Sequence, residues 1–161
     1  MEPTITNIPS KLLVGMKKDM TFRNDKTSEL WRSFMARRQE IEHRVNEYYF
    51  NVQVYEHKLD WNRVSLDTPI QKWAAVEVEG IRLPEGMDAL ELQGGWYAVF
   101  VHRGPASTFM NTLRFIFETW LPASRYELDH REHFEKLQEN YHPQDEKAVE
   151  EVWIPIKKIS M

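Results

Sequence analysis

The order of apolar and polar residues predicts a chain made mainly of β-strands. In the first half, alternating or continuous apolar character occurs in segments 11–20, 48–56 and 70–80. In the second half it occurs in segments 95–103, 131–140 and 150–159. Successive side chains of a strand point to opposite faces, so these patterns indicate strands with one or both faces buried.

Two other segments repeat their apolar residues with the period of a helix. The first begins near Thr27 or Ser28, either of which can cap the first turn, and its apolar stripe consists of Leu30, Trp31, Phe34 and Met35. The second covers 106–121 and ends before Pro122, and its stripe consists of Met110, Leu113, Phe117 and Trp120. We therefore expect one helix in each half of the chain.

The predicted order is β-α-β-β, a turn-rich hinge within 80–95, and then β-α-β-β again. This duplication predicts an α+β fold and a single domain over residues 1–161. Two βαββ units with pseudo-twofold symmetry would form an antiparallel sheet, with two helices around a central groove. Residues 1–10 include Pro3 and Pro9 and are expected to be an extended lead-in.

Segment 95–103 is apolar on both faces, so both faces should be covered. One face carries Trp96, Ala98, Phe100 and His102, and the other carries Tyr97, Val99, Val101 and Arg103. We expect one face to contact a helix and the other to line the groove between the halves. The alternative is a plain aromatic core without a cavity.

Composition narrows the possible functions. The chain carries a formal net charge of −4, 12% aromatic residues and no cysteine. A negative chain without a basic stripe is a poor match for a nucleic-acid backbone binder, and the lack of cysteine excludes disulfides, thiolate catalysis and cysteine-zinc sites. The sequence shows neither a signal peptide nor an apolar run of membrane-spanning length, so we expect a soluble, cytoplasmic protein.

Motifs for metals and cofactors are also missing from the sequence. It has no P-loop, no Gly-x-Gly-x-x-Gly fingerprint and no His-Glu-x-x-His motif. His130 and His133 are three residues apart and would point to opposite faces of a strand. We therefore expect neither a metal nor a cofactor.

Two acids are candidates for a role in binding or catalysis. Glu151 and Trp153 lie at i and i+2 of a predicted strand, so a carboxylate and an indole project from the same face. Such a pair suits an organic cation, although Glu151 could instead be a solvated strand end. Glu135 is a weaker second candidate, because its alternation with Phe134 leaves open which of the two points inward.

Other aromatic residues could line a pocket, since tryptophan and tyrosine combine a flat apolar ring with one polar atom. These candidates are Trp31, Tyr55, Trp73, Trp96, Tyr97 and Trp120. Trp31 and Trp120 lie on amphipathic helices, where a position in the core is the alternative.

The second half also resembles a known family. The matching residues are Pro84-Glu85-Gly86, Gly94-Gly95-Trp96-Tyr97-Ala98-Val99-Phe100, Gly104-Pro105, Trp120-Leu121-Pro122, Tyr126-Glu127-Leu128, Phe134-Glu135 and Glu151-Val152-Trp153-Ile154-Pro155-Ile156. In these motifs the chain resembles the GyrI-like small-molecule-binding domain, the effector-binding part of certain AraC-type and MerR-type multidrug-sensing regulators. The resemblance is specific over 83–157 and looser over 11–80. It implies a duplicated, SHS2-like βαββ fold with a central aromatic pocket, and it places the pocket acid at Glu151.

The resemblance implies a protein that binds a hydrophobic, planar and often cationic small molecule. Some standalone relatives hydrolyse cyclopropane-bearing DNA-alkylating toxins, so Glu151 could instead be a catalytic general base. A third alternative is a protein partner, because one relative inhibits DNA gyrase. About ten residues precede the first predicted strand and no helix-turn-helix is visible, so we do not expect direct DNA binding.

Overall fold

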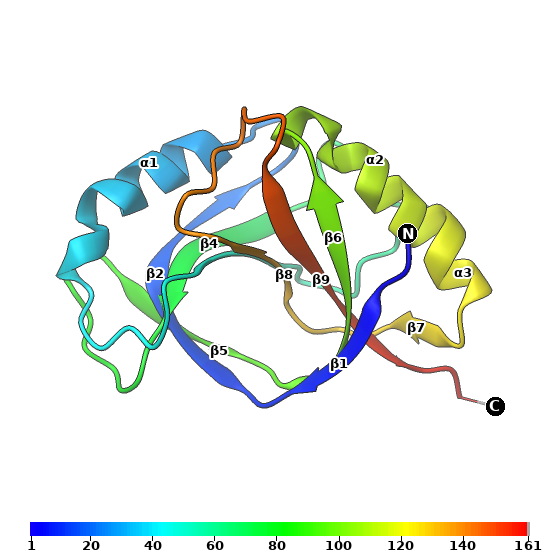
Figure 1. Ribbon diagram of the computed structural model, residues 1–161, viewed down its shortest axis with the longest axis horizontal. Coiled ribbons are helices and arrows are strands. Elements are labelled where there is room, and N and C mark those ends of the chain that lie inside the picture. The colour runs from blue at the N-terminus through cyan, green and yellow to red at the C-terminus, as the bar shows by residue number, and fades with distance from the viewer. Residues whose placement is uncertain (161) are drawn as a thin grey trace.

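The computed structural model describes residues 1–160. It shows a curved antiparallel sheet with two helical segments on the same side of it (Figure 1). The first half of the chain contains β1 (Thr4–Ile8), β2 (Lys11–Met20), α1 (Thr27–Arg37), the 3-10 turn η1 (Arg38–Glu40), β3 (Tyr49–Val54) and β4 (Ile70–Glu77).

The second half begins with β5 (Asp88–Leu92) and β6 (Gly95–Arg103). A continuous helical segment follows, made of η2 (Ala106–Thr108), α2 (Phe109–Arg114), the π-helical turn η3 (Phe115–Trp120) and α3 (Leu121–Ala123). The chain then forms β7 (Tyr126–Leu128), β8 (His133–Leu137) and β9 (Val149–Lys158).

The α+β class and the duplicated order of elements are confirmed, and β2 and β6 have the predicted bounds. Three short strands were not predicted. β1 lies in the expected lead-in, β5 in the expected hinge, and β7 directly after the second helix. Proline and glycine mark turns around β1 and β5, and the partners that make both segments strands are distant in sequence. The cap of α1 also differs, because the Asp25 carboxylate accepts hydrogen bonds from the Thr27 backbone nitrogen at 2.9 Å and from its hydroxyl at 2.6 Å.

The two halves exchange their first strands. The sheet order is β1-β6-β9-β8-β3-β4-β2-β5, with β7 paired to the end of β9. β1 of the first half therefore pairs with β6 of the second, and β5 of the second pairs with β2 of the first. The order is symmetric about the central β3–β8 pair, which is the pseudo-twofold relation that the sequence predicts.

Apolar clusters cover both faces of the sheet. α1 packs on β2 and β4 through Leu30 and Phe34, and the segment 106–123 packs on β6 and β9 through Ile116. On the opposite face lies an inner cluster, whose buried members are Leu13, Phe50, Val52, Trp73, Ala75, Leu92, Tyr97, Phe134 and Trp153. These residues come from both halves of the chain.

The Tyr97 end of the second face of β6 packs in this inner cluster, whereas Val101 on the same face is 38% exposed. Tyr97 is fully buried there, with its ring 5.3 Å from that of Phe134 and 5.7 Å from that of Trp153. The aromatic core is therefore found at Tyr97, and a groove along the outer part of this face stays a prediction. Curvature of the sheet brings aromatic side chains of both halves together, and these rings fill the space.

The exchanged strands force two connections to cross. Segment 8–10 joins β1 to β2 and passes against segment 93–95, which joins β5 to β6. At the crossing, the backbone nitrogen of Gly94 donates a hydrogen bond to Ser10 Oγ at 3.2 Å. A Cβ atom on Gly94 would lie 2.6 Å from the carbonyl oxygen of Ile8, a distance that real Cβ atoms do not adopt. The crossing therefore requires glycine at this position.

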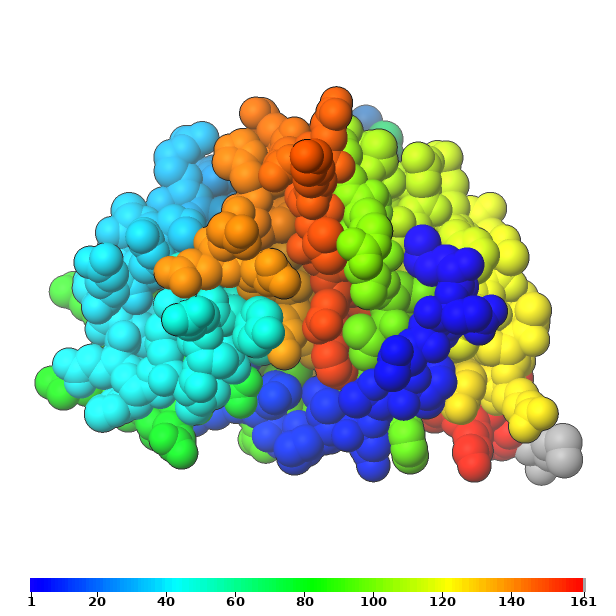
Figure 2. Space-filling model, in the orientation of Figure 1, coloured from blue at the N-terminus to red at the C-terminus, as the bar shows by residue number. Residues whose placement is uncertain are grey.

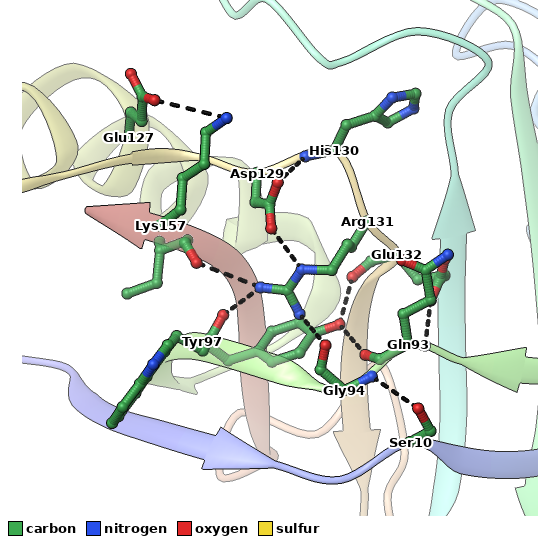
Figure 3. A network of polar contacts seen from close by, with 12 residues as sticks. Ser10, Gln93, Gly94, Tyr97, Glu127, Asp129, His130, Arg131, Glu132 and Lys157 are labelled. Atoms are coloured by element: carbon green, nitrogen blue, oxygen red, sulfur yellow. Dashed lines mark hydrogen bonds and ion pairs between the residues drawn. The ribbon is translucent and has the colours of Figure 1, made fainter. Parts of the chain in front are cut away.

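Arg131 ties the elements around this crossing together (Figure 3). Its side chain is 8% exposed, and its Nε donates a hydrogen bond to Asp129 at 2.8 Å. Its terminal nitrogens donate to the backbone carbonyl oxygens of Gly94, Trp96 and Ile156. The guanidinium also lies 4.6 Å from the centre of the Tyr97 ring, a favourable cation–π contact. One buried side chain thus joins the start of β6, the end of β9 and the turn before β8.

We expect Gly94→Ala to lower the free energy of unfolding by about 2–3 kcal/mol, because the added methyl group must displace the backbone that crosses it. Gly80→Ala is the matched control. Gly80 has a φ of +85°, but an added Cβ would meet no atom within 4 Å, so this change should cost only backbone strain of about 1 kcal/mol. Urea unfolding measures both losses. Equal losses would contradict the steric constraint at the crossing.

Candidate functional site

Four polar side chains stand on the helix side of the two central strands. Asn51 and Gln53 come from β3, and His133 and Glu135 come from β8. Asn51 is paired with Glu135 across the two strands, and Gln53 with His133. α1 covers the sheet on one side of them and segment 106–123 covers it on the other. These four residues form a polar row along the middle of an otherwise apolar sheet, which we name the central strip.

Glu135 is the acid of the central strip. It is 6% exposed, and its Oε1 accepts hydrogen bonds from Asn51 Nδ2 at 2.9 Å and Gln53 Nε2 at 3.0 Å. Asn51 Oδ1 in turn accepts a hydrogen bond from Trp31 Nε1 of α1 at 3.2 Å. Both bonds to the carboxyl group end on one oxygen. No ion pair within residues 1–160 involves Glu135.

The surroundings of Glu135 favour its protonated form. Burial and the nearby Glu150 carboxylate raise the pKa of Glu135 to about 8, although Lys72 and the two amide hydrogen bonds act in the opposite direction. Glu150 lies on the same side of the sheet, one diagonal position away on β9. Burial also raises the pKa of Glu150. Glu135 therefore retains its proton for most of the time at neutral pH.

Glu150 is held by residues from outside the central strands. It is 7% exposed and paired with His102 of β6, whose Nδ1 lies 2.6 Å from Thr112 Oγ1 of α2. Against the larger effect of burial, Tyr141 lowers the pKa of Glu150. Tyr141 belongs to the loop 138–148, drawn in orange in Figure 2, which packs beside β9. This loop covers one part of the site.

The loop 55–69 between β3 and β4 places aromatic rings next to the His133 end of the central strip. The Tyr55 ring meets the His133 ring edge-on, with centroids 5.1 Å apart. Trp61 stacks on Phe117 of η3, with centroids 4.9 Å apart and an angle of 12° between the planes. Phe117 is also nearly parallel to His133, at 6.4 Å. We name these four side chains the aromatic wall.

Space remains within this loop. A cavity of about 180 Å³ is lined by Tyr55, Glu56, His57, Lys58, Leu59, Asp60, Arg63, Val64, Thr68 and Pro69. Tyr55 thus contacts the cavity and also His133 of the central strip. The loop is therefore packed less tightly than the sheet beneath it.

The imidazole of His133 is a neutral member of the aromatic wall. Burial, together with the positive charges of His130 and Arg131, lowers the pKa of His133 to about 3. His133 is therefore uncharged at neutral pH and does not act as a counter-ion for Glu135.

Glu151 and Trp153 share a face, as predicted, but it is the inner face of the sheet. Trp153 Nε1 donates a hydrogen bond to Glu151 Oε1 at 3.1 Å, and the indole stacks on Phe134 with centroids 5.1 Å apart. The alternation of β9 places Glu150 on the side of the central strip and Glu151 on the other. The structure therefore does not bring Glu151 and Glu135 together. It also answers the question left open by the sequence, because Glu135 rather than Phe134 points toward the helices.

The remaining aromatic candidates fall into separate places. Trp31 and Tyr55 contact the central strip. Trp73 and Tyr97 are buried in the inner cluster. Trp120 lies on the second helical segment and packs against Phe100 and Tyr126. Trp96 is 50% exposed on β6. Only Trp31 and Tyr55 of these candidates lie beside the buried acid.

Several residues of the site were missed at the level of sequence. Asn51 and Gln53 could have been found, because they are polar residues at i and i+2 of an otherwise apolar strand. Glu150 directly precedes Glu151 in a charged run, so its place in the site was not visible in the sequence. Trp61 and Phe117 are 56 positions apart in the sequence (117 − 61), so no local pattern could pair them.

Metal-ligand clusters and membrane-spanning helices are both absent from the described part of the chain. Within residues 1–160, no group of three or more histidine, aspartate or glutamate side chains is arranged to hold a metal ion. No helix in that range is long and apolar enough to cross a bilayer.

The raised pKa of Glu135 makes stability depend on pH. The unfolded carboxyl group loses its proton near pH 4.5, but the folded one keeps it up to about 8. Between these values the folded state binds one more proton, so stability falls as pH rises, by about 1.4 kcal/mol per pH unit. We expect the melting temperature of the wild type, relative to Glu135→Gln, to fall by about 3–6 °C per pH unit in this window.

Scanning calorimetry of the two proteins across this range measures the effect. The lowered pKa of His133 destabilises the folded protein as pH falls below 6.5. Subtracting the melting temperature of Glu135→Gln from that of the wild type removes this contribution, because both proteins contain His133. A constant difference in melting temperature would contradict a buried, protonated Glu135.

Comparisons with known proteins agree with this fold. The structure of SAV2435 bound to tetraphenylphosphonium has a TM-score of 0.74 at 17% identity, over 98% of this chain and 94% of that one. The C-terminal domain of EcmrR has a TM-score of 0.72 at 10% identity, over 98% of each chain. A hydrolase encoded by lin2189 from Listeria innocua has a TM-score of 0.60 at 12% identity, over 97% of this chain and 92% of that one.

These identities show a shared fold and nothing more specific. No curated protein matches the sequence. The sequence pattern of the GyrI-like small molecule binding domain, in contrast, matches residues 1–157. The chain belongs to the GyrI-like family.

Proposed function

We propose that the protein binds an aromatic organic cation at the central strip, with Glu135 as its counter-ion. This proposal replaces Glu151, the acid favoured by the sequence, with an acid on the opposite face of the sheet. The observation that carries it is a carboxyl group buried between the two helical segments, with amide donors but no ion-pair partner among residues 1–160.

Such a group is costly for the fold, because a buried carboxyl group loses its hydration and an ionised one would lack a compensating charge. Groups of this kind are concentrated at functional sites, where a ligand supplies the missing charge. An incoming cation would stabilise the ionised form of Glu135 and release its proton. The empty site limits the cost by remaining protonated.

The surroundings of Glu135 suit a cation with aromatic surface. Trp31 approaches from α1, and Tyr55 approaches from the opposite side through its contact with His133. Aromatic faces attract cations by about 0.5–2 kcal/mol per well-placed ring. The bound state of SAV2435 supports this ligand class, since tetraphenylphosphonium is an aromatic cation and the two chains share a fold.

We expect the affinity for tetraphenylphosphonium to rise with pH. If the cation binds only the ionised carboxyl group, affinity should increase about tenfold per pH unit below pH 8 and level off above it. Glu135→Gln should remove most of this dependence and weaken binding about tenfold or more at high pH. Isothermal titration calorimetry in two buffers of different ionisation enthalpy measures both the affinity and the released proton.

The other titratable groups near Glu135 determine which control variants the binding experiment needs. Glu150, Lys72 and Tyr55 are electrostatically coupled to it, and His133 stays neutral. Glu150 also has a raised pKa, so Glu135→Gln should keep a weaker pH dependence that Glu150→Gln removes. Glu151→Gln is the matched control on the opposite face. A loss of cation affinity in Glu151→Gln alone would overturn the assignment of Glu135.

A hydrolytic role is the second candidate. A carboxyl group that keeps its proton at neutral pH can act as a general acid, and Glu135 meets this condition. One structural neighbour is a hydrolase. If the protein hydrolyses a strained electrophile such as an activated cyclopropane, Glu135→Gln should slow turnover by about 10²–10⁴-fold. Product formation followed by mass spectrometry measures this rate, and equal rates in both proteins would exclude Glu135 as the acid.

A further inference from the structure

Trp61 makes the contacts that a flat aromatic ligand would make. Its indole ring lies nearly parallel to the Phe117 ring, at 4.9 Å and 12°. Its Nε1–H group donates a hydrogen bond to the Glu118 carboxylate at 3.0 Å. A ring stack and a hydrogen bond to an acid therefore hold one side chain of the loop 55–69 against the helical segment.

The attachment of this loop is local. Trp61 is only partly buried, and the cavity of about 180 Å³ lies within the loop rather than in the core. The far side of the loop is held by Arg23, whose side chain pairs with Asp67 at 2.8 Å and whose backbone nitrogen donates to the Leu66 carbonyl oxygen at 2.9 Å. Trp61 can therefore leave Phe117 without disturbing the inner cluster or the sheet.

The surface on which Trp61 packs belongs to the helical segment 106–123 and not to the loop 55–69. Phe117 and Glu118 are consecutive residues of η3, and this π-helical turn presents a buried ring and an exposed carboxylate side by side. π-Helical turns are frequent at functional sites. Phe117 is also nearly parallel to His133, which lies two residues before Glu135 on the same face of β8.

We propose that Phe117 and Glu118 form a subsite for flat aromatic rings that carry an N–H group, and that Trp61 occupies this subsite when no ligand is bound. The inference rests on the proposed function, because it concerns the outer part of the site whose acid is Glu135. A ligand that enters must replace the indole on Phe117 and take over its hydrogen bond to Glu118.

Trp61 thus acts as an internal competitor. When a protein spends only a fraction of its time in the open state, the apparent affinity for a ligand is reduced by that fraction. Ligands that stack better than indole and that donate a hydrogen bond gain most from displacing it. The loop therefore selects among aromatic cations, and flat amino-substituted rings are favoured over bulky ones.

Two probes test this selection. Proflavine is a flat cation with amino groups, whereas tetraphenylphosphonium is a bulky cation without N–H groups. We expect Trp61→Ala to tighten proflavine binding about tenfold at about pH 8.5, and to change tetraphenylphosphonium binding less than about threefold. In the Trp61→Ala background, Glu118→Gln should weaken proflavine binding and leave tetraphenylphosphonium binding unchanged.

Leu66→Ala is the matched control for changes in the same loop. Leu66 is 54% exposed, and it contributes its backbone carbonyl to the contact with Arg23, which the substitution keeps. This variant should bind both probes as the wild type does. Tighter proflavine binding in Leu66→Ala as well would show that any loosening of the loop suffices, and would overturn the specific role of Trp61.

The wild-type protein provides a second measurement that does not depend on the folding of a variant. The chain has six tryptophans, so a nitrogen-15 spectrum shows one indole N–H signal for each. Trp61→Phe assigns the signal of Trp61. Saturating proflavine should move this signal, because its hydrogen bond to Glu118 is lost. An unmoved signal in the complex would overturn the inference.

The outcomes separate this inference from the proposed function. If proflavine binds in a manner that depends on Glu135, but Trp61→Ala leaves its affinity unchanged, lowers it, or tightens both probes equally, only the subsite is wrong. If Glu135→Gln has no effect on either probe while Trp61→Ala tightens proflavine, the acid is wrong and the subsite stands. Lack of proflavine binding to both the wild type and Trp61→Ala would overturn the subsite, and lack of binding of both probes would overturn the proposed function as well.

Discussion

The crossing of segments 8–10 and 93–95 is the constraint on which the rest of the structure depends. It allows each half to give its first strand to the other, and Gly94 and Arg131 make it possible. Gly94 permits the close approach of two backbones. Arg131 then satisfies three carbonyl oxygens near the crossing while its own charge is paired with Asp129. The interlocked halves therefore behave as one sheet rather than as two.

The candidate site follows from this interlocking. The β3–β8 pair lies at the centre of the sheet, so one half supplies the amides of Asn51 and Gln53 and the other supplies the Glu135 carboxyl group. The helices cover the flanking strands. The central strands β3 and β8 are covered by the loops 55–69 and 138–148. The two faces of the central strands β3 and β8 have different roles. The inner face is a packed aromatic cluster that holds the halves together, and the outer face carries the buried acids.

The electrostatic cost of the site is kept low by the neutral forms of its members. His133 is neutral because burial disfavours its charge, and Glu135 keeps its proton for the same reason. Burial also raises the pKa of Glu150, and Tyr141 and His102 act in the opposite direction. In the proposed function, a bound cation would stabilise the ionised form of Glu135 and so add one negative charge to the site.

The sequence by itself determined the strand and helix pattern, the duplication, and the kinds of residue that could bind a cation. These features depend on local periodicity, which is visible in β2, β6 and the two apolar helix stripes. It could not determine which face of β8 or β9 belongs to the site, because both faces of these central strands carry buried side chains. The pattern favoured Glu151 through its spacing to Trp153, and only the packing of the helices and of the inner cluster places Glu135 and Glu150 on one face and Glu151 on the other. The short strands β1 and β5, and the contact of Trp61 with Phe117, were decided by tertiary structure alone, since each depends on a partner that is far away in the sequence.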